Sequence, residues 1–203
     1  MYQVMKRIID IVVSMIGVIF IVPIICYILI LKIKYHEKGP IFYKQFRIGK
    51  NGKPFLMYKF RTMLTNADEL LEKEMQTNQN IKTEYEKNRK LVNDFRVTNV
   101  GKKLREKNID EWPQFINALK GEMSVVGPRP YMLKEKKDIK NYHEIIMCKP
   151  GITGPWQITR GKKDFNMRNE LDLKYCNNMT LRYDVKILLY TVRNLICSTR
   201  GTS

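Results

Sequence analysis

Two adjacent acidic residues, Asp110 and Glu111, stand in the segment of the chain best suited to chemistry. They open a predicted amphipathic helix over residues 109–119, with Arg105 just upstream. Downstream, Arg129 lies between two prolines that restrict the backbone on both sides. Carboxylates among cations suit a site that binds phosphate through Mg²⁺ and arginine. A structural role is the alternative, because acidic residues in the first turn of a helix interact favourably with its dipole.

Histidine and cysteine are too scarce for two common kinds of site. The chain has 2 histidines and 4 cysteines, and no two cysteines have the CxxC spacing. A zinc site and a mechanism built on a Ser-His-Asp or Cys-His arrangement are therefore disfavoured. We interpret the four cysteines as ordinary thiols of a reducing compartment. Any acid–base chemistry is then left to carboxylates.

The net charge of +17, with an isoelectric point near 9.7, is extreme for a chain of 203 residues. Nucleic acid, an anionic membrane or a phosphate-rich substrate would each account for it. The sequence contains no nucleic-acid-binding motif of the RNP or zinc-finger type, so we expect no nucleic acid partner. With 44% hydrophobic residues, the chain is expected to fold as one domain, with or without an appendage.

Residues 11–31 form an apolar run, IVVSMIGVIFIVPIICYILIL, without a charged side chain. As an α-helix this run would be about 31 Å long, which is enough to cross a bilayer. No small-residue cleavage site follows it, which disfavours a cleaved signal peptide. A buried core helix is the other alternative, although the run is apolar on every side.

Pro23 lies in the middle of this run, where its ring and missing N–H interrupt a helix. Basic residues flank both ends: Lys6, Arg7, Lys32, Lys34 and Lys38. Such flanks are typical of the cytoplasmic side, so both ends are expected there. We therefore predict a re-entrant membrane helix over residues 1–38 that bends at Pro23, in contact with the lipid bilayer, and a second domain over residues 39–203 at the cytoplasmic face.

The remaining chain alternates short regular elements with loops rich in glycine and proline. Residues 39–63 are typical of a β-hairpin around Asn51-Gly52. Helices are expected after Asn66, a candidate N-cap, and over residues 165–176, whereas residues 121–130 and 149–161 are interpreted as loops.

Residues 184–197 predict a last, basic amphipathic helix. One face carries Leu188, Val192 and Leu195, and the polar side carries Lys186 and Arg193. Such a helix lies on a membrane or packs against the core. The expected fold class is α+β, mainly helical, with a small β-hairpin, an N-terminal re-entrant membrane helix and interfacial amphipathic helices.

Several long motifs follow one another along the chain: KRIIDIVV, YKFRTM, DFRVTNVGKKLR, IDEWPQFINALKGEMSVVGPRP, KPGITGPWQI and LDLKYCNNMTLRYDVKILLYTV. In this order they closely resemble the bacterial monotopic phosphoglycosyl transferases, which start glycan assembly on undecaprenyl phosphate. The resemblance runs from Lys6 to about Val192. Because no further membrane-spanning region precedes Lys6, the chain resembles the small, minimal form of the family.

The resemblance implies a UDP-sugar donor, a polyprenyl phosphate acceptor and a location at the bacterial cytoplasmic membrane, with residues 39–203 as the catalytic domain. Asp110 matches the nucleophile, which attacks the β-phosphate, releases UMP and carries the sugar phosphate until polyprenyl phosphate takes it. Glu111 matches an acid/base or acceptor-activating residue. Mg²⁺ would bridge Asp110 and the diphosphate. Positions on the basic surface beside this site are matched by Lys59, Arg61, Arg105 and Arg129.

This chemistry is physically reasonable, because a carboxylate becomes a nucleophile toward phosphorus once the phosphoryl charge is neutralised. Cleavage of a diphosphate needs mainly positioning and charge stabilisation, so no histidine is required. Downstream glycosyltransferases are expected partners. No residue selects one UDP-sugar over another, since members of the family that use different sugars share the acidic pair.

The chain departs from the family pattern in two places. The membrane break reads Val22-Pro23, where serine usually precedes the proline, and Arg160-Gly161 stands where Gly-Arg is usual. The alternative function is a membrane-anchored basic adaptor or scaffold without catalysis. It accounts for the charge and the apolar segment, but not for the acidic pair or the Pro-Arg-Pro turn.

Overall fold

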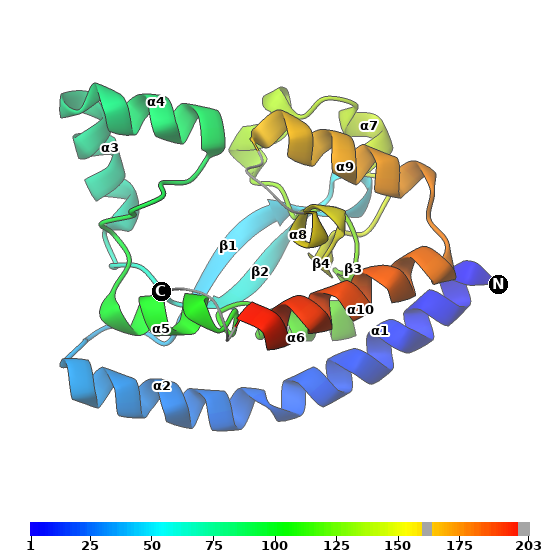
Figure 1. Cartoon of the computed structure of the whole chain (residues 1–203), viewed down its shortest axis with the longest axis horizontal. Coiled ribbons are helices and arrows are strands. Elements are labelled where there is room, and N and C mark those ends of the chain that lie inside the picture. Colours follow the sequence, from blue (N-terminus) through cyan, green and yellow to red (C-terminus); the bar gives the residue numbers. More distant parts are fainter. Residues whose placement is uncertain (160–163, 199–203) are drawn as a thin grey trace.

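The computed structural model describes residues 1–159 and 164–198 (Figure 1). The predicted fold class, α+β and mainly helical, is confirmed. Two short 3₁₀ turns cover Lys50–Gly52 and Leu133–Asp138. The strands are β1 (Phe42–Ile48), β2 (Pro54–Phe60), β3 (Ser124–Val126) and β4 (Gly151–Thr153). The helices are α1 (Tyr2–Ile19), α2 (Ile21–Tyr35), α3 (Ala67–Thr77), α4 (Gln79–Asn88), α5 (Asn99–Glu106), α6 (Gln114–Lys120), α7 (Tyr142–Ile145), α8 (Pro155–Ile158), α9 (Phe165–Asn177) and α10 (Leu181–Ser198).

The predicted β-hairpin is present as the antiparallel pair β1–β2. At its turn Asn51 and Gly52 have φ angles of 57° and 74°, the left-handed region that asparagine and glycine tolerate best. Phe55 and Met57 alternate into the core, which gives the hairpin one buried face. The predicted helix over 165–176 is confirmed as α9, and α3 begins after Asn66 as expected, but without a side-chain cap from that residue.

The two segments interpreted as loops each contain a short strand, which corrects the sequence prediction. Strands β3 and β4 pair in parallel, with Ser124 opposite Gly151. A side chain at Gly151 would collide with the backbone of Gly127, so glycine is required for this close approach. The glycines that indicated loops instead allow two buried strands to meet.

The predicted break in the N-terminal apolar helix is confirmed, and it lies one turn before Pro23. Helix α1 ends at Ile19 and α2 begins at Ile21, because Pro23 has no N–H for the carbonyl four residues earlier. Figure 1 shows α1 and α2 end to end in a shallow bend along one side of the molecule, not side by side. The segment Tyr2–Tyr35 is long and apolar enough, by length and composition, to cross a membrane.

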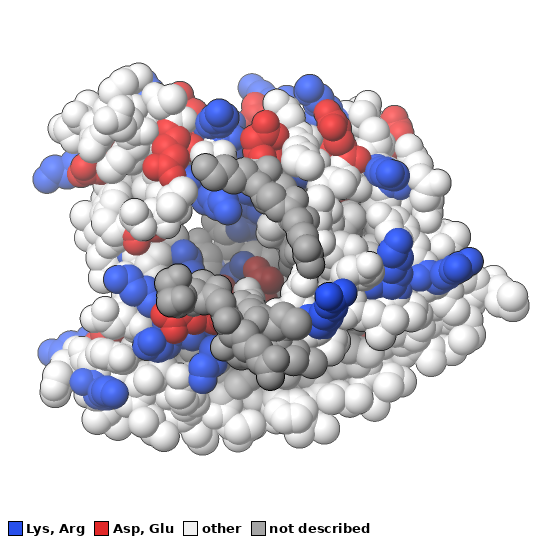
Figure 2. Space-filling model, viewed as in Figure 1, with Lys and Arg blue, Asp and Glu red and all other residues white. Residues whose placement is uncertain are grey.

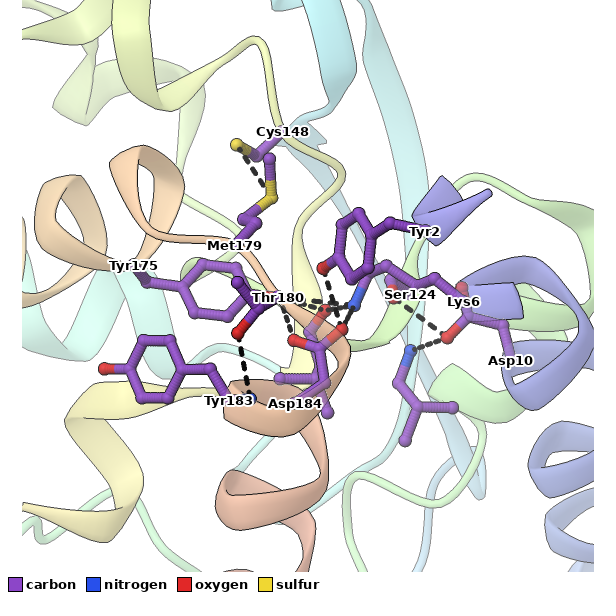
Figure 3. A network of polar contacts seen from close by, with 12 residues as sticks. Tyr2, Lys6, Asp10, Ser124, Cys148, Tyr175, Met179, Thr180, Tyr183 and Asp184 are labelled. Atoms are coloured by element: carbon purple, nitrogen blue, oxygen red, sulfur yellow. Dashed lines mark hydrogen bonds and ion pairs between the residues drawn. The ribbon is translucent and has the colours of Figure 1, made fainter. Parts of the chain in front are cut away.

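The basic residues before the apolar run, which were predicted to mark its cytoplasmic side, also bind other parts of the protein. The Lys6 ammonium lies 2.8 Å from both the Asp184 carboxylate and the Val126 carbonyl. Figure 3 shows this ammonium, the Tyr175 hydroxyl and the Tyr2 hydroxyl gathered around Asp184. A buried cation needs such partners. Lys6 therefore fastens α1 to α10.

Arg7 and Asp10 complete this attachment. The Arg7 guanidinium donates to the carbonyls of Ala118 and Leu119, which end α6 and need a donor there. The buried Asp10 carboxylate accepts from the Val125 N–H at 2.8 Å and from a neighbouring serine hydroxyl. The first turns of α1 are thus attached to α6, α10 and β3, in the part of the chain that follows residue 38.

The opposite side of the N-terminal helices is apolar and exposed. We call it the apolar face of α1 and α2. In the space-filling view the edge that these helices form is largely free of charge (Figure 2). A large exposed apolar surface marks a contact with lipid or protein. The side chains that form the apolar face are Val4, Met5, Ile8, Val12, Met15, Ile16, Ile19, Phe20, Val22, Leu29, Ile30 and Ile33.

Helix α10 packs against the core and also keeps exposed apolar residues. Ile187 is fully buried and Leu188 is half-buried, whereas Leu189 and Val192 are exposed. Core packing is thus confirmed for one side of the helix. The side chain of Leu195 lies outside the described residues.

Candidate active site

The two acidic residues lie in the turn between α5 and α6, not in the first turn of a helix as predicted. Helix α6 begins only at Gln114, after Pro113 at its N-cap. The Phe60 N–H, at the end of β2, donates to the Asp110 carbonyl at 2.9 Å. The hairpin therefore holds the turn that carries both acids. A role in the first turn of a helix no longer explains them.

Lys59 reaches this turn from β2. Its ammonium lies 2.6 Å from the Glu111 carboxylate, and both side chains are partly exposed. Burial raises the pKa of Asp110, and the adjacent Glu111 raises it further. The positive charges of Lys59 and Arg105 lower this pKa, but the net shift is upward. Burial also works to raise the pKa of Glu111, but the ion pair with Lys59 holds it below its usual value. Adjacent carboxyl groups with pKa values pushed apart are typical of catalytic pairs.

A hollow lined by Arg47, Lys59, Glu111, Gln114, Arg129 and Trp156 adjoins this turn, and Glu111 is the member of the acidic pair in its wall. We call it the basic hollow. Burial and the charge of Arg129 lower the pKa of Arg47 to about 10. Within the described part of the chain, the buried Nε atoms of both arginines have no hydrogen-bond acceptor. Two partly buried guanidinium groups in the wall of one hollow suit an anion such as a phosphate. Figure 2 shows acidic and basic side chains together in a hollow of this face.

Helix α9 contributes Asp172, which contacts Arg129. The Asp172 carboxylate accepts from the Arg129 N–H at 3.0 Å and from the Tyr131 hydroxyl at 2.8 Å. The Trp156 ring lies 5.8 Å from the Arg129 guanidinium and 5.4 Å from that of Arg168, within cation–π range. These contacts fix the position of Arg129 at the hollow.

Sequence reasoning missed Arg47, Trp156 and Asp172 as parts of this site. Trp156 belongs to KPGITGPWQI and Asp172 to LDLKYC, two of the motifs on which the family resemblance depends. Membership in a shared motif was therefore the available signal. Arg47 belongs to none of these motifs, and only the packing of β1 reveals it.

The other predicted residues divide into two groups. The Arg105 Nε donates to the Thr62 hydroxyl at 3.0 Å, and its charge lowers the pKa of Asp110, so it belongs to the site. Arg61 does not line the basic hollow. It lies over the Tyr43 ring and lines a separate hollow with Lys32 near the end of α2.

Pro23 lies in the N-terminal apolar segment rather than at the basic hollow. It is exposed within α2, away from the acidic pair. The predicted departure at Arg160-Gly161 lies outside the described residues. The thiols of Cys26, Cys148 and Cys176 are free, as predicted, while the Cys197 side chain is outside the described part.

The acidic pair suits Mg²⁺ better than a metal enclosed by protein ligands. Among the described residues, no three His, Cys, Asp or Glu side chains cluster around a metal position. Magnesium is usually held by one or two carboxylates together with substrate phosphates. Asp110 takes part in no ion pair within the described residues, whereas Glu111 is paired with Lys59. The donor set therefore fits a Mg²⁺ that arrives with a phosphate substrate.

Comparison with known proteins agrees with this chemistry. The family model described as bacterial sugar transferase matches residues 1–198. The chain is 40% identical to the undecaprenyl-phosphate galactose phosphotransferase of Salmonella typhimurium over 193 residues. These aligned residues cover 93% of this chain and 40% of that protein. This chain is 38% identical over 202 residues to the UDP-glucose:undecaprenyl-phosphate glucose-1-phosphate transferase of Klebsiella pneumoniae, covering 94% and 40% of the two chains.

A relative closer in length is the exopolysaccharide production protein ExoY of Rhizobium meliloti. It is 36% identical over 200 residues, which cover 97% of this chain and 87% of that protein. The chain thus spans about two fifths of the length of the Salmonella and Klebsiella relatives and most of the length of ExoY.

Proposed function

Because this chain belongs to the bacterial sugar transferase family, we propose that it moves a sugar phosphate from a UDP-sugar to polyprenyl phosphate. The observation that carries the proposal is the geometry around Glu111. Glu111, held by Lys59, lines a hollow together with two arginines whose Nε atoms are buried, and Asp110 precedes it in the same turn. The relatives' names specify undecaprenyl phosphate and UDP-sugars, which supply the expected substrates.

The basic hollow binds the diphosphate of the donor. Arg47 and Arg129 supply partly buried guanidinium groups whose Nε atoms have no acceptor in the described chain, so donors for the phosphates are already in position. Trp156 and Asp172 keep Arg129 in place. A bound Mg²⁺, held by Asp110, would neutralise part of the charge on the diphosphate.

Asp110 is the proposed nucleophile. Its carboxylate oxygen forms a bond to the β-phosphorus of the UDP-sugar, and the bond from that phosphorus to the bridging oxygen breaks, which releases UMP. The product is a sugar phosphate esterified to Asp110. An oxygen of polyprenyl phosphate then attacks the same phosphorus and displaces the carboxylate. Glu111, kept ionised by Lys59, accepts a proton from the incoming phosphate.

The apolar face of α1 and α2 is the proposed membrane contact. Both ends of the bent helix are fastened to the same domain, α1 through Lys6 and α2 through Glu37, whose carboxylate accepts from the Val100 N–H. A straight span would carry one end across the bilayer, away from that domain. The enzyme therefore sits on the cytoplasmic face, where a soluble nucleotide sugar and a lipid phosphate meet. Its product enters glycan synthesis, where downstream glycosyltransferases extend it.

The test is a single-turnover assay in detergent with a panel of UDP-sugars and Mg²⁺ but no lipid. With the right sugar we expect a burst of UMP and a gain of one sugar phosphate in the protein mass, located on Asp110. Asp110→Asn should abolish both, whereas Glu106→Gln, on the exposed side of α5, should abolish neither. Direct attack by the lipid in a ternary complex would give no UMP before the acceptor is added. A scaffold protein would give none at all.

A further inference from the structure

A second hollow, with a volume of about 500 Å³, opens between α1, α6 and α10. We call it the apolar hollow. This volume lies within the usual range of ligand pockets. Two threonines in its wall, Thr153 and Thr191, satisfy each other by a 2.7 Å hydrogen bond, so they do not require water there. The larger part of its wall is built from Val13, Trp112, Phe115, Val125, Leu188 and Val192.

The apolar hollow and the basic hollow meet at Glu111. Glu111, Ile152 and Trp156 line both of them. On one side of Glu111 the wall carries guanidinium groups, and on the other side it carries aliphatic and aromatic side chains. A ligand that uses the apolar hollow therefore has a long apolar part, and its polar end lies at Glu111.

The apolar hollow borders α1 beside the apolar face of α1 and α2. Val13 lines the hollow, and Ile16, one turn further along α1, is an exposed member of that face. On α10, Val192 lines the hollow and is 53% exposed. An apolar chain can thus pass from the membrane contact to Glu111 along a mostly apolar wall, which favours it over a polar ligand.

We propose that the apolar hollow holds the isoprene units next to the phosphate of the polyprenyl acceptor. The acceptor phosphate then reaches Glu111 from the side opposite Arg47 and Arg129, which hold the donor. The isoprene units and the donor diphosphate thus occupy different hollows, while the attacking acceptor oxygen enters opposite the Asp110 oxygen, at the position on phosphorus that UMP has left. The inference rests on the proposed function, because it assigns the acceptor of that reaction to one hollow.

The experiment uses the full chain in lipid nanodiscs and a polyprenyl phosphate that carries a diazirine on its first isoprene unit. After irradiation, labelled peptides are mapped by mass spectrometry. We expect label in residues 108–115 and 185–194, and competition by unlabelled polyprenyl phosphate but not by phosphatidylglycerol. Label confined to α2, or equal competition by the diacyl lipid, would overturn the proposal.

Two variants of α10 form a matched pair. Val192→Arg puts a charge at the mouth of the apolar hollow, where its desolvation should reduce labelling about tenfold. Leu189→Arg puts the same charge at a position that is 66% exposed and does not line the hollow, so labelling should stay at the parent level. Val192→Leu should retain labelling, which excludes damage to the helix. Equal losses in the two arginine variants would contradict the proposal.

Release of UMP by the parent protein without acceptor tests the proposed function separately. UMP release with label outside the hollow would refute only the acceptor site. Label in the hollow without UMP release from any UDP-sugar would refute the transfer reaction and leave a lipid site.

Discussion

The Lys59 ammonium lies 2.6 Å from the Glu111 carboxylate, and this ion pair joins strand β2 to the turn that carries both acidic residues. The next residue of the strand, Phe60, donates its N–H to the Asp110 carbonyl. Two consecutive residues of the hairpin thus position two consecutive residues of the site. The hairpin therefore positions the two acidic residues of the candidate active site.

Replacing Lys59 by methionine should lower transfer activity about tenfold, because a charge-assisted contact to Glu111 is lost while the apolar stem is kept. The free energy of unfolding should change by less than about 1 kcal/mol, since both partners are partly exposed. Steady-state UMP release and thermal unfolding measure the two effects. Lys44→Met, at an exposed position of β1, serves as the control and should change neither.

Arg129→Lys should reduce activity about thirtyfold, which corresponds to about 2 kcal/mol for a lost charged hydrogen bond. Lysine supplies a point charge but not the planar fork that binds two phosphate oxygens. The Arg129 N–H bond to Asp172 involves the backbone and is unaffected, so stability should stay at the parent level. Arg182→Lys, on the exposed start of α10, is the control. Activity within about twofold of the parent would show that Arg129 only stabilises the loop.

Asp172 should make stability depend on pH. Burial raises its pKa from 3.8 to about 6 in the folded protein. Between these values the folded protein binds more protons than the unfolded chain, so the contribution of this group to the free energy of unfolding falls as pH rises and is level above about 6. Asp172→Asn cannot titrate and should lack this fall. Denaturant unfolding of both proteins in detergent between about pH 4 and 7 gives the difference; parallel curves would contradict the assignment.

Asp10→Ala should destabilise the protein by about 3 kcal/mol, because it leaves the buried Val125 N–H and the Ser124 hydroxyl without their acceptor. Asp10→Asn retains one acceptor oxygen and should cost less. Thermal unfolding in detergent measures both variants. If Asp10→Ala unfolds at the parent temperature, the attachment of α1 to β3 contributes little to stability.

The two ends of the N-terminal helix should lie on the same side of the membrane. Cysteines introduced at Gln3 and His36, in a chain without its native cysteines, should both react with an impermeant thiol reagent added from the cytoplasmic side. Pro23→Ala should not separate them, since the contacts of Lys6 and Glu37 hold both ends to the domain. Labelling from opposite sides would establish a full span.

Elements that depend on neighbouring residues could be predicted from the sequence alone. The hairpin follows from two apolar runs around Asn51-Gly52, and the helix break follows from the missing N–H of Pro23, because both effects act within a few residues. The acidic pair, and the resemblance of the chain to the family, could also be recognised from the sequence. Each of these features depends on residues that are close together in the chain, so the sequence pattern alone is enough to predict it.

Tertiary structure decided the features that join distant segments. Lys6 was predicted to be a membrane flank, but it binds Asp184, 178 positions away, because a cation beside a buried carboxylate is more stable paired than solvated at a lipid surface. Arg47 joins Arg129 at the hollow only because β1 packs against the Pro-Arg-Pro turn. The apolar hollow needs three helices to form its walls. Pairings of this kind depend on which surfaces the folded chain brings together, and no local pattern encodes them.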